Sequence, residues 1–329
     1  MPDEVSLARL CAVLPPVDAL ALADSRCLLL LSDAADPAVE NRRSALVIVD
    51  LATAGGTVVG EFPGASELVL WSREYGAGEL NLGALVVSPG GLVWKLRPGG
   101  VVERVHGAFG DDGPQKHGFL NCCARQGEII FVGGMSRQLY RCRVDQAEFE
   151  HVDECLLDRD MSDAESAIYG LVDLDGRHLV GVGGSGLVFW LDQGTTRFLD
   201  SGTNVMLNAV CAVDAETFLA CGAGGLLLRG SSQGWCQTQT SGSAGMYFSD
   251  VRTQGDRNLW IGSRRLYASR GGDRWSDLVP VDDAPAVSRF VRGGASTWAI
   301  GARHVGWTVD GNRWVWMPTD SIKITLRES

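Results

Sequence analysis

Short apolar runs alternate with polar, glycine-rich turns along the whole chain, and no stretch carries the 3.6-residue period of an amphipathic helix. Residues 207–213 form one apolar run, and a polar turn separates them from a second run at 218–222. A glycine-rich turn leads to a third run at 226–229, and another tight turn precedes a tryptophan in a fourth. Turn signals between short strands predict a four-stranded antiparallel unit of about 40 residues.

This unit recurs four times, at residues 167–204, 205–244, 245–284 and 285–320. The glycine that ends the second apolar run keeps spacings of 39, 40 and 39 between copies, at Gly183, Gly222, Gly262 and Gly301. An apolar residue follows four positions later in each copy, at Leu187, Leu226, Leu266 and Val305. A tryptophan follows 13 positions after the glycine in three copies, at Trp235, Trp275 and Trp314. We expect this tryptophan to pack between neighbouring units.

The first half of the chain repeats the pattern more loosely, over residues 8–64, 65–116 and 117–166. In the last of these, Gly133 and Leu139 are expected in the roles of the repeat glycine and the following apolar residue. A single four-stranded unit cannot cover both of its faces, but units packed radially cover one another. The sequence therefore predicts one all-β domain, a seven-bladed β-propeller of four-stranded antiparallel blades. Six blades remain the alternative if the first segment is a partial blade, and the tail 321–329 is expected to supply a ring-closing strand.

Composition supports this interpretation and narrows the range of partners. Glycine is abundant, with 42 residues against 11 prolines, which is typical of many tight β-turns. The formal net charge is −11, and no Lys/Arg run is longer than two, so a basic stripe for nucleic acid is not expected. A basic protein is the better electrostatic partner.

Location and cysteine chemistry are also indicated by the sequence. The first residues lack the pattern of a signal peptide, and the apolar run Cys27–Leu31 suits a buried strand rather than a membrane span. Nine cysteines without a CxxC pair predict reduced thiols rather than a disulfide framework or zinc site. We therefore expect a cytoplasmic monomer without membrane contact or cofactor.

The stretch 207–242, LNAVCAVDAETFLACGAGGLLLRGSSQGWCQTQTSG, resembles the BNR-type (Asp-box) repeats of photosystem II assembly-factor-like propellers of the WD40/YVTN/BNR-like group. The resemblance is clear over residues 167–320. The chain departs from the pattern in the last copy, where Asp310 and Gly311 precede Trp314 at a spacing one residue short. The resemblance implies a propeller whose Asp-box turn is structural, and an assembly-factor role.

Sialidases share Asp boxes, so an enzyme must be considered. That chemistry needs an arginine cluster, a nucleophile such as tyrosine with glutamate, and an acidic aspartate. The repeat places Tyr140 and Tyr267 in third strands and Tyr169 and Tyr247 in first strands. We therefore expect no catalytic residue, and a carbohydrate-binding or sialidase-like propeller is the alternative.

The spacing of the histidines and acidic residues bears on whether the chain binds a metal. Five histidines, at 106, 117, 151, 178 and 304, show no metal-binding spacing. Asp173 and Asp175 are expected to shape a turn rather than to bind calcium. No metal site is predicted.

The loops that interrupt the repeat are the best candidates for binding. In a four-stranded blade, the link to the next blade emerges on the same side as the turn between strands two and three, so one face carries both. Segment 150–165 contains seven acidic residues and is longer than the repeat requires. The candidate partner-binding residues are Asp111, Asp112, Asp153, Glu154, Asp158, Asp160, Asp163, Arg137, Arg264, Arg265, Arg303 and His304.

These features predict a non-catalytic propeller that binds one protein partner on a charged loop face. The specific forms are an assembly factor, or an immunity (antitoxin) protein that neutralises a secreted bacterial effector. A soluble acidic chain suits the second form, since a complementary field favours a basic toxin or effector.

Overall fold

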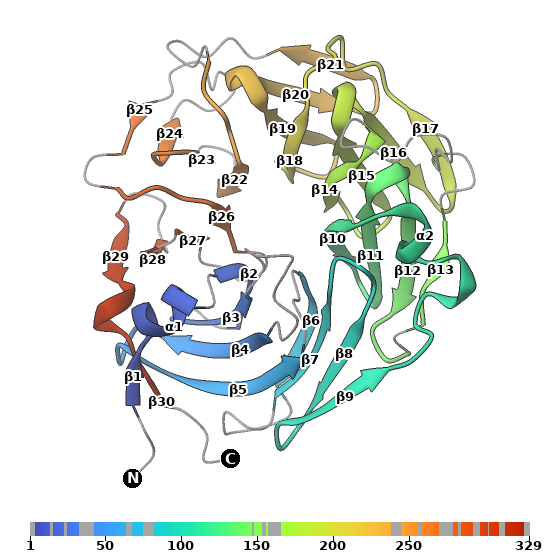
Figure 1. Cartoon of the computed structure of the whole chain (residues 1–329). Coiled ribbons are helices and arrows are strands. Elements are labelled where there is room, and N and C mark those ends of the chain that lie inside the picture. The colour runs from blue at the N-terminus through green and yellow to red at the C-terminus, as the bar shows by residue number, and fades with distance from the viewer. Residues whose placement is uncertain are drawn as a thin grey trace. The chain divides into compact units, whose positions relative to one another are not determined.

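The structure is a computed structural model that describes residues 4–13, 16–22, 25–32, 43–63, 68–74, 82–146, 148–152, 156, 166–237, 245–254, 258–269, 279–281, 284–291, 297–301, 303–308 and 313–325. The described residues form seven sheets, each built around four consecutive antiparallel strands (Figure 1). The chain is an all-β, seven-bladed β-propeller, as the sequence predicted, and the six-bladed alternative is wrong.

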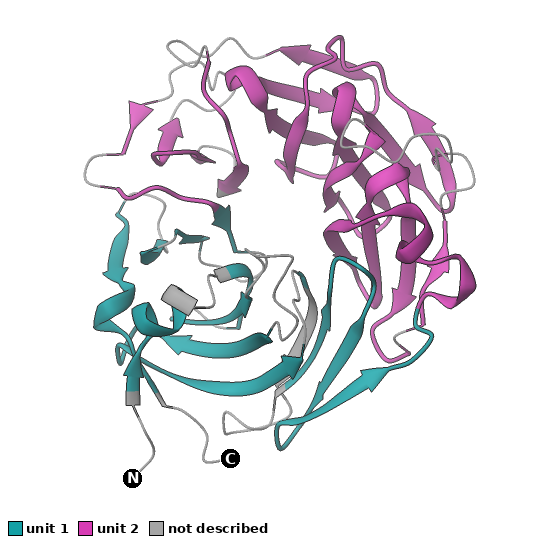
Figure 2. Ribbon diagram, in the orientation of Figure 1, with its two compact units in different colours: residues 1–108, 289–329 teal, residues 109–288 magenta. Residues whose placement is uncertain are grey.

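The chain divides into two compact units (Figure 2). Unit 1 comprises residues 1–108 and 289–329, and unit 2 comprises residues 109–288. Unit 1 contains the first two sheets and the last, and unit 2 contains the four sheets between them in sequence.

The strands of unit 1 belong to three sheets. The first contains β2 (Pro16–Ala21), β3 (Arg26–Ser32), β4 (Arg43–Asp50) and β5 (Gly55–Pro63), extended by β30 (Lys323–Thr325) and β1 (Glu4–Ser6). The second contains β6 (Leu68–Glu74), β7 (Leu82–Val87), β8 (Val93–Arg97) and β9 (Val101–Val105). The last contains β26 (Arg289–Phe290), β27 (Thr297–Ile300), β28 (His304–Thr308) and β29 (Val315–Pro318).

The strands of unit 2 belong to four sheets. The first sheet contains β10 (Leu120–Gln126), β11 (Ile129–Gly134), β12 (Leu139–Arg143) and β13 (Glu150–His151). The second contains β14 (Ile168–Asp173), β15 (His178–Gly183), β16 (Val188–Asp192) and β17 (Thr195–Phe198). The third contains β18 (Leu207–Ala212), β19 (Thr217–Gly222), β20 (Leu227–Ser231) and β21 (Gly234–Gln237). The fourth contains β22 (Asp250–Gln254), β23 (Asn258–Gly262), β24 (Tyr267–Ser269) and β25 (Val279–Pro280).

In the part of the chain that the structure describes, helical segments are few and short. They are α1 (Leu7–Val13), α2 (Pro114–His117), and the 3₁₀ turns η2 (Gly110–Asp112), η3 (Met135–Arg137), η5 (Gly184–Gly186), η6 (Ala223–Gly225) and η7 (Thr319–Ser321). Among the described residues, no helix has the length and apolar character needed to cross a membrane.

The tail strand β30 lies beside β5 and pairs with it in parallel, while β1 pairs antiparallel with β30. Because β2–β5 already provide four strands, β30 and β1 are a fifth and a sixth strand of the first sheet. Ile324 of β30 is fully buried in the core of unit 1. The two ends of the chain are thus joined in one sheet.

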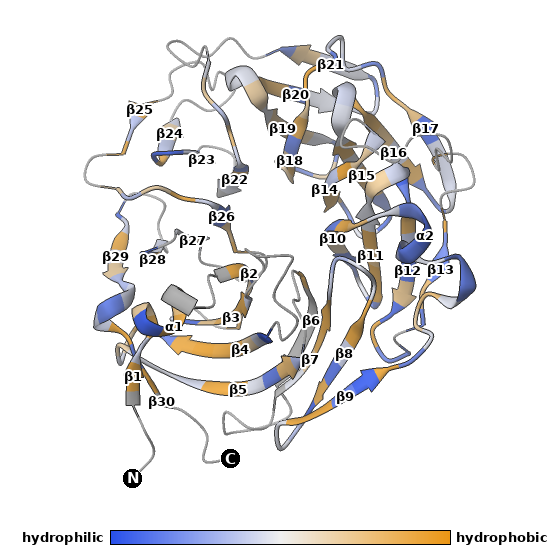
Figure 3. Ribbon diagram, viewed as in Figure 1, coloured by the Kyte–Doolittle hydropathy of each residue, from blue (hydrophilic) through white to orange (hydrophobic). Residues whose placement is uncertain are grey.

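The hydrophobic core is divided into layers between neighbouring sheets. In unit 1, Val47 of β4 belongs to the same buried cluster as Trp298 of β27. In unit 2, Trp190 of β16 shares a cluster with Phe218 of β19, and Trp235 of β21 packs at its edge. In Figure 3 the strand β4 is largely hydrophobic, whereas α2 is hydrophilic. The strands therefore pack face against face, as the repeat predicted.

The repeat glycines have a steric role. A Cβ atom on Gly183 or Gly222 would lie 2.0 Å from the carbonyl oxygen of Ala167 or Met206, in the segment just before the first strand of the same sheet. In the looser copy at 117–166 the equivalent residue is Gly134 rather than Gly133, because its N–H donates to Gln138 just as that of Gly183 donates to Leu187. Sequence alignment missed this because Gln138, a polar residue, occupies the apolar position.

In one copy the repeat tryptophan, Trp235, packs against a cluster that two neighbouring sheets share, as predicted, and in another copy its assignment is corrected. The ring of Trp235 lies over Gly230 and contacts Phe218 edge-on, with ring centroids 4.4 Å apart. In the last sheet the ring over the equivalent glycine, Gly306, is that of Trp316 rather than Trp314. Trp314 precedes β29 and stacks on Trp316. Trp275 lies outside the described residues.

Candidate functional site

The structure describes seven of the twelve predicted partner-binding residues. Asp153, Glu154, Asp158, Asp160 and Asp163 lie outside the described residues, so their role stays a prediction. Segment 150–165, expected to be one loop, begins with the edge strand β13. The remaining candidates occupy links and turns, except His304, which is the first residue of a strand.

Asp111 and Asp112 lie in η2, in the link between β9 and β10. Arg137 ends η3, in the turn between β11 and β12, and Arg264 and Arg265 are exposed in the turn between β23 and β24. In unit 1, Arg303 precedes β28 and His304 is its first residue. The structure brings Asp112 together with two histidines, His117 and His151, that the sequence did not single out.

The link before β10 is held against the turn between β11 and β12. The N–H of Met135 donates to the carbonyl of Phe119 at 2.8 Å, and the hydroxyl of Ser136 donates to the carbonyl of His117 at 2.9 Å. Buried Gln138 donates through Nε2 to the carbonyl of Gly118 at 2.9 Å and accepts from the Tyr140 hydroxyl at 2.9 Å. These bonds place the link and the turn at the same end of the sheet.

The first strands of the four sheets in unit 2 pack against one another in matching register. Asn121, the second residue of β10, donates to the carbonyl of Ile168, the first residue of β14. Asn208, the second residue of β18, donates to the carbonyl of Phe248 in the link before β22 at 2.7 Å. The starts of these strands, with the links that lead to them, therefore lie at one edge of unit 2, called here the strand-start edge.

Two large aromatic side chains are exposed at the strand-start edge. Phe119 and Tyr247 are 59% and 54% exposed. Each directly precedes a fully buried apolar residue, Leu120 or Phe248. The backbone carbonyl of each accepts a hydrogen bond from the turn between the second and third strands of its own sheet. They therefore occupy the same position in two sheets. The equivalent residues in the sheets between them are buried Ala167 and half-buried Met206.

Sequence analysis missed both aromatic positions for different reasons. Tyr247 was expected in a first strand, but it lies in the link before β22. Its hydroxyl forms a hydrogen bond with Oδ1 of Asn208 at 3.1 Å, across the boundary between two sheets. Phe119 closes the polar link that also contains Asp111 and Asp112, where no pattern distinguishes an exposed aromatic from a buried one. Aligning the residues that directly precede Leu120 and Phe248 would have identified the shared position.

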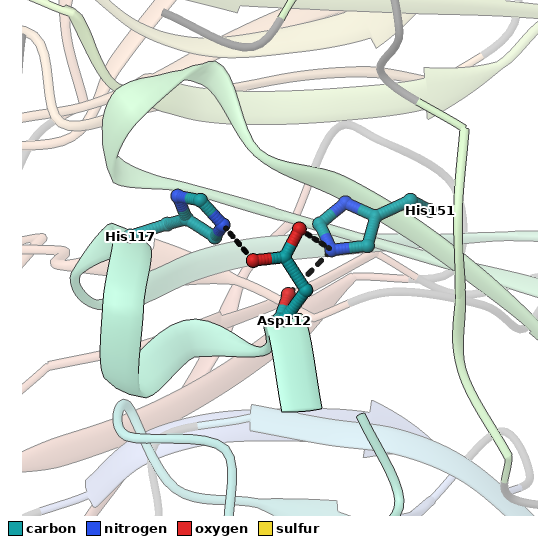
Figure 4. A group of neighbouring side chains, drawn as sticks. All are labelled: Asp112, His117 and His151. Carbon is teal, nitrogen blue, oxygen red and sulfur yellow. Dashed lines mark hydrogen bonds and ion pairs between the residues drawn. The ribbon is translucent and has the colours of Figure 1, made fainter. Parts of the chain in front are cut away.

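Asp112 lies between His117 and His151 (Figure 4). Its Oδ1 is 3.2 Å from Nε2 of His117 and 3.6 Å from Nζ of Lys116, and its Oδ2 is 3.8 Å from Nε2 of His151. The hydrogen bond from His117 lowers the pKa of the Asp112 carboxyl, and the neighbouring positive groups add to this effect against the opposing influence of burial.

A groove of about 890 Å³ lies at the outer parts of the first two sheets of unit 2. Among the residues that line it are Arg143 and Arg177, which pair with Asp145 at 3.2 Å and Asp192 at 3.1 Å. A third lining arginine, Arg141, pairs with Glu150. Each of these three guanidinium groups is thus already matched by a carboxylate of the chain.

The chain was also compared with known proteins. No family model matches it. Over 126 residues, or 38% of the chain, it is 29% identical to the "Immune protein Tsi7" of Pseudomonas aeruginosa, and the match spans 41% of that protein's length. The chain thus corresponds to less than half of this curated relative.

Among solved structures, the WD40 repeats of RRP9 have a TM-score of 0.59 at 12% identity, covering 87% of each chain. A chain from the mitotic checkpoint complex has a TM-score of 0.58 at 12% identity, covering 97% of this chain and 91% of its own. At this identity the similarity shows the fold alone. The propeller prediction is confirmed, while membership of the Asp-box assembly-factor group stays a prediction.

Proposed function

We propose that this chain is a non-catalytic protein-binding propeller that acts as an immunity protein, neutralising a bacterial effector by binding it at the strand-start edge of unit 2. The observation that carries the proposal is the exposure of Phe119 and Tyr247 at equivalent positions of that edge. Large aromatic side chains contribute most to protein–protein affinity when a partner removes them from water.

The surroundings of the two aromatics suit a protein partner. Arg264 and Arg265 are exposed in the turn that follows β23, the strand paired with β22, and Asp111 is exposed in the link that ends at Phe119. Arginine beside aromatic residues is the composition that interface centres favour. Both signs of charge are present, so the edge can form ion pairs with basic and acidic groups of a partner.

The net charge of the chain adds a preference for the partner's overall sign. At −11, the long-range field attracts a basic protein and speeds its encounter with the chain. The similarity to an immune protein of Pseudomonas aeruginosa supports the same class of function. A basic effector is therefore the partner that these observations favour.

The test uses the protein encoded beside this chain in its native genome, purified or co-expressed with the intact chain. We expect the chain to protect bacteria from that protein and to bind it directly in calorimetry. Phe119→Ala and Tyr247→Ala should each weaken binding at least ~10-fold, because hot-spot truncations cost about 2 kcal/mol or more. Tyr247→Phe keeps the ring and should bind nearly as the wild type does.

Phe198→Ala is the matched control, because Phe198 is an exposed aromatic at the end of β17, the fourth strand of its sheet. Its substitution should leave both affinity and protection unchanged. If the Phe119→Ala/Tyr247→Ala double variant binds and protects as well as the wild type, the strand-start edge is not the interface. If the wild type neither binds nor protects against the neighbouring gene product, the immunity proposal fails for that partner class.

A further inference from the structure

Three side chains converge where the link that precedes β10 meets the edge strand β13. Asp112 belongs to η2, His117 is the last residue of α2, and His151 is the last residue of β13 (Figure 4). One donor atom from each lies within 4.8 Å of the other two. The imidazoles of the two histidines stand edge to face, with ring centroids 5.8 Å apart.

We propose that Asp112, His117 and His151 form a zinc site that fastens the link 109–119 to the edge strand β13. Two imidazole nitrogens and a carboxylate oxygen are a donor set that Zn²⁺ takes in proteins, with a fourth position left for water. Around a tetrahedral ion with bonds of about 2.0–2.1 Å, donor atoms are separated by roughly 3.3 Å. The 3.2 Å between Nε2 of His117 and Oδ1 of Asp112 already matches that spacing.

Binding requires a change of tautomer at both histidines and a small movement of His151. Nε2 of His117 donates to the Asp112 carboxylate, so this nitrogen carries a proton that must move to Nδ1 before it can bind zinc. Nε2 of His151 lies within hydrogen-bonding distance of the Asp112 carbonyl oxygen, which can only accept, so this nitrogen also carries the proton in this arrangement. At each histidine, coordination replaces the N–H···O bond by a Zn–N bond, and the Nε2 proton moves to Nδ1. The carboxylate of Asp112 lies 3.8 Å from Nε2 of His151, so the required movement is short.

The position of the site gives the ion a structural role. Strand β13 has two residues and pairs with β12 through Tyr140–His151 and Arg141–Glu150. Such a short edge strand gains little from its own ladder. A zinc ion would tie it to α2 and η2. In this assignment Asp112 is a metal ligand rather than a member of the partner-facing rim.

The test is a zinc titration of the full-length protein after treatment with a chelator and dialysis, with a competing indicator dye to report affinity. We expect one Zn²⁺ per chain, and Co²⁺ in the same site should give the visible absorption of a four-coordinate ion. Zinc should also raise the thermal unfolding midpoint. Asp112→Asn and His151→Gln should each weaken zinc binding at least ~10-fold, since each removes a ligand.

His178→Gln is the matched control. His178 also lies between two carboxylates, with Nδ1 2.7 Å from Asp175 and Nε2 3.7 Å from Asp192, but only one histidine is present there. This variant should bind zinc as the wild type does. Because His117 is buried, the decision rests on the more exposed Asp112 and His151. Equal zinc binding by the wild type and the Asp112→Asn/His151→Gln double variant, or no binding by the wild type at ~100 μM zinc, would overturn the proposal.

Discussion

Nη1 of Arg289 donates to Oδ1 of Asp18 at 3.1 Å, joining residues that are 271 positions apart in the sequence. Asp18 lies on β2 and Arg289 begins β26, so the pair connects the first sheet with the last inside unit 1. The Asp18 side chain is 1% exposed, whereas that of Arg289 is 40% exposed. The carboxylate is therefore buried, and the arginine provides charge compensation from the surface.

Loss of this arginine should destabilise the protein strongly. Arg289→Met keeps the aliphatic stem but removes the guanidinium group that pairs with the buried Asp18 carboxylate, and removing one partner of a buried pair costs about 3 kcal/mol. Arg177→Met is the control, because Arg177 pairs with Asp192 at the surface, where such pairs contribute about 0–1 kcal/mol. Urea unfolding followed by tryptophan fluorescence measures both. A loss in Arg289→Met no larger than in Arg177→Met would contradict this role.

Gly222→Ala should be a second strongly destabilising change. The backbone at Gly222 is extended, so the cost comes from the new methyl group, which would meet the Met206 carbonyl oxygen at 2.0 Å and that carbonyl's carbon at 3.0 Å. Backbone on both sides must move, and overpacking of this kind costs about 1–3 kcal/mol. A Cβ on Gly90 would meet nothing within 4 Å, so Gly90→Ala is the matched control. We expect the free energy of unfolding of Gly90→Ala to lie within about 0.5 kcal/mol of the wild-type value. Similar urea unfolding midpoints for the two variants would refute the steric explanation.

The fold was predictable because its main signal is local and repeated. Gly183 and Gly222 occupy equivalent positions because in both sheets a Cβ atom would meet the carbonyl oxygen that precedes the first strand, and alignment of the repeats detects the two glycines directly. The signal failed where a polar residue replaced an apolar one. In the copy at 117–166, buried Gln138 stands at the apolar position and forms hydrogen bonds with Gly118 and Tyr140 in place of apolar packing. Because the apolar residue was missing there, Gly133 was aligned in place of Gly134. Such a substitution depends on partners that sequence periodicity does not reveal.

The candidate site was less predictable because it depends on contacts between distant segments. The turn positions of Arg137, Arg264 and Arg265 follow from strand order alone and were found in advance. His117 and His151 are separated by 34 positions and meet only because β13 returns to the edge of the sheet beside the link. Short-range ligand motifs such as H-x₃₋₅-H do not include such a pair. Exposure of Phe119 likewise depends on the link geometry rather than on its neighbours in sequence.

Asp214 provides a pH-dependent prediction. Its carboxylate, in the turn between β18 and β19, accepts the N–H groups of Glu216 and Thr217 at 2.8 and 2.7 Å. Burial pushes the pKa of Asp214 upward, but these bonds together with the Thr217 hydroxyl outweigh it and hold the pKa below 3.8. A depressed folded-state pKa means that the stabilisation is complete above 3.8 and is lost as the pH falls through the folded-state value.

Asp214→Ala should therefore lower the free energy of unfolding by about 1 kcal/mol at pH 7, the usual net contribution of such hydrogen bonds. The difference from the wild type should shrink as the pH is lowered below 3.8, where the wild-type carboxyl becomes protonated. Asp214→Asn retains an oxygen acceptor for the two N–H groups and does not titrate, so its difference from Asp214→Ala should stay constant with pH. Urea unfolding at several pH values from 7 down to about 3 measures all three proteins. A gap between wild type and Asp214→Ala that is the same at both ends of that range would show that the carboxylate charge plays no part in holding the turn.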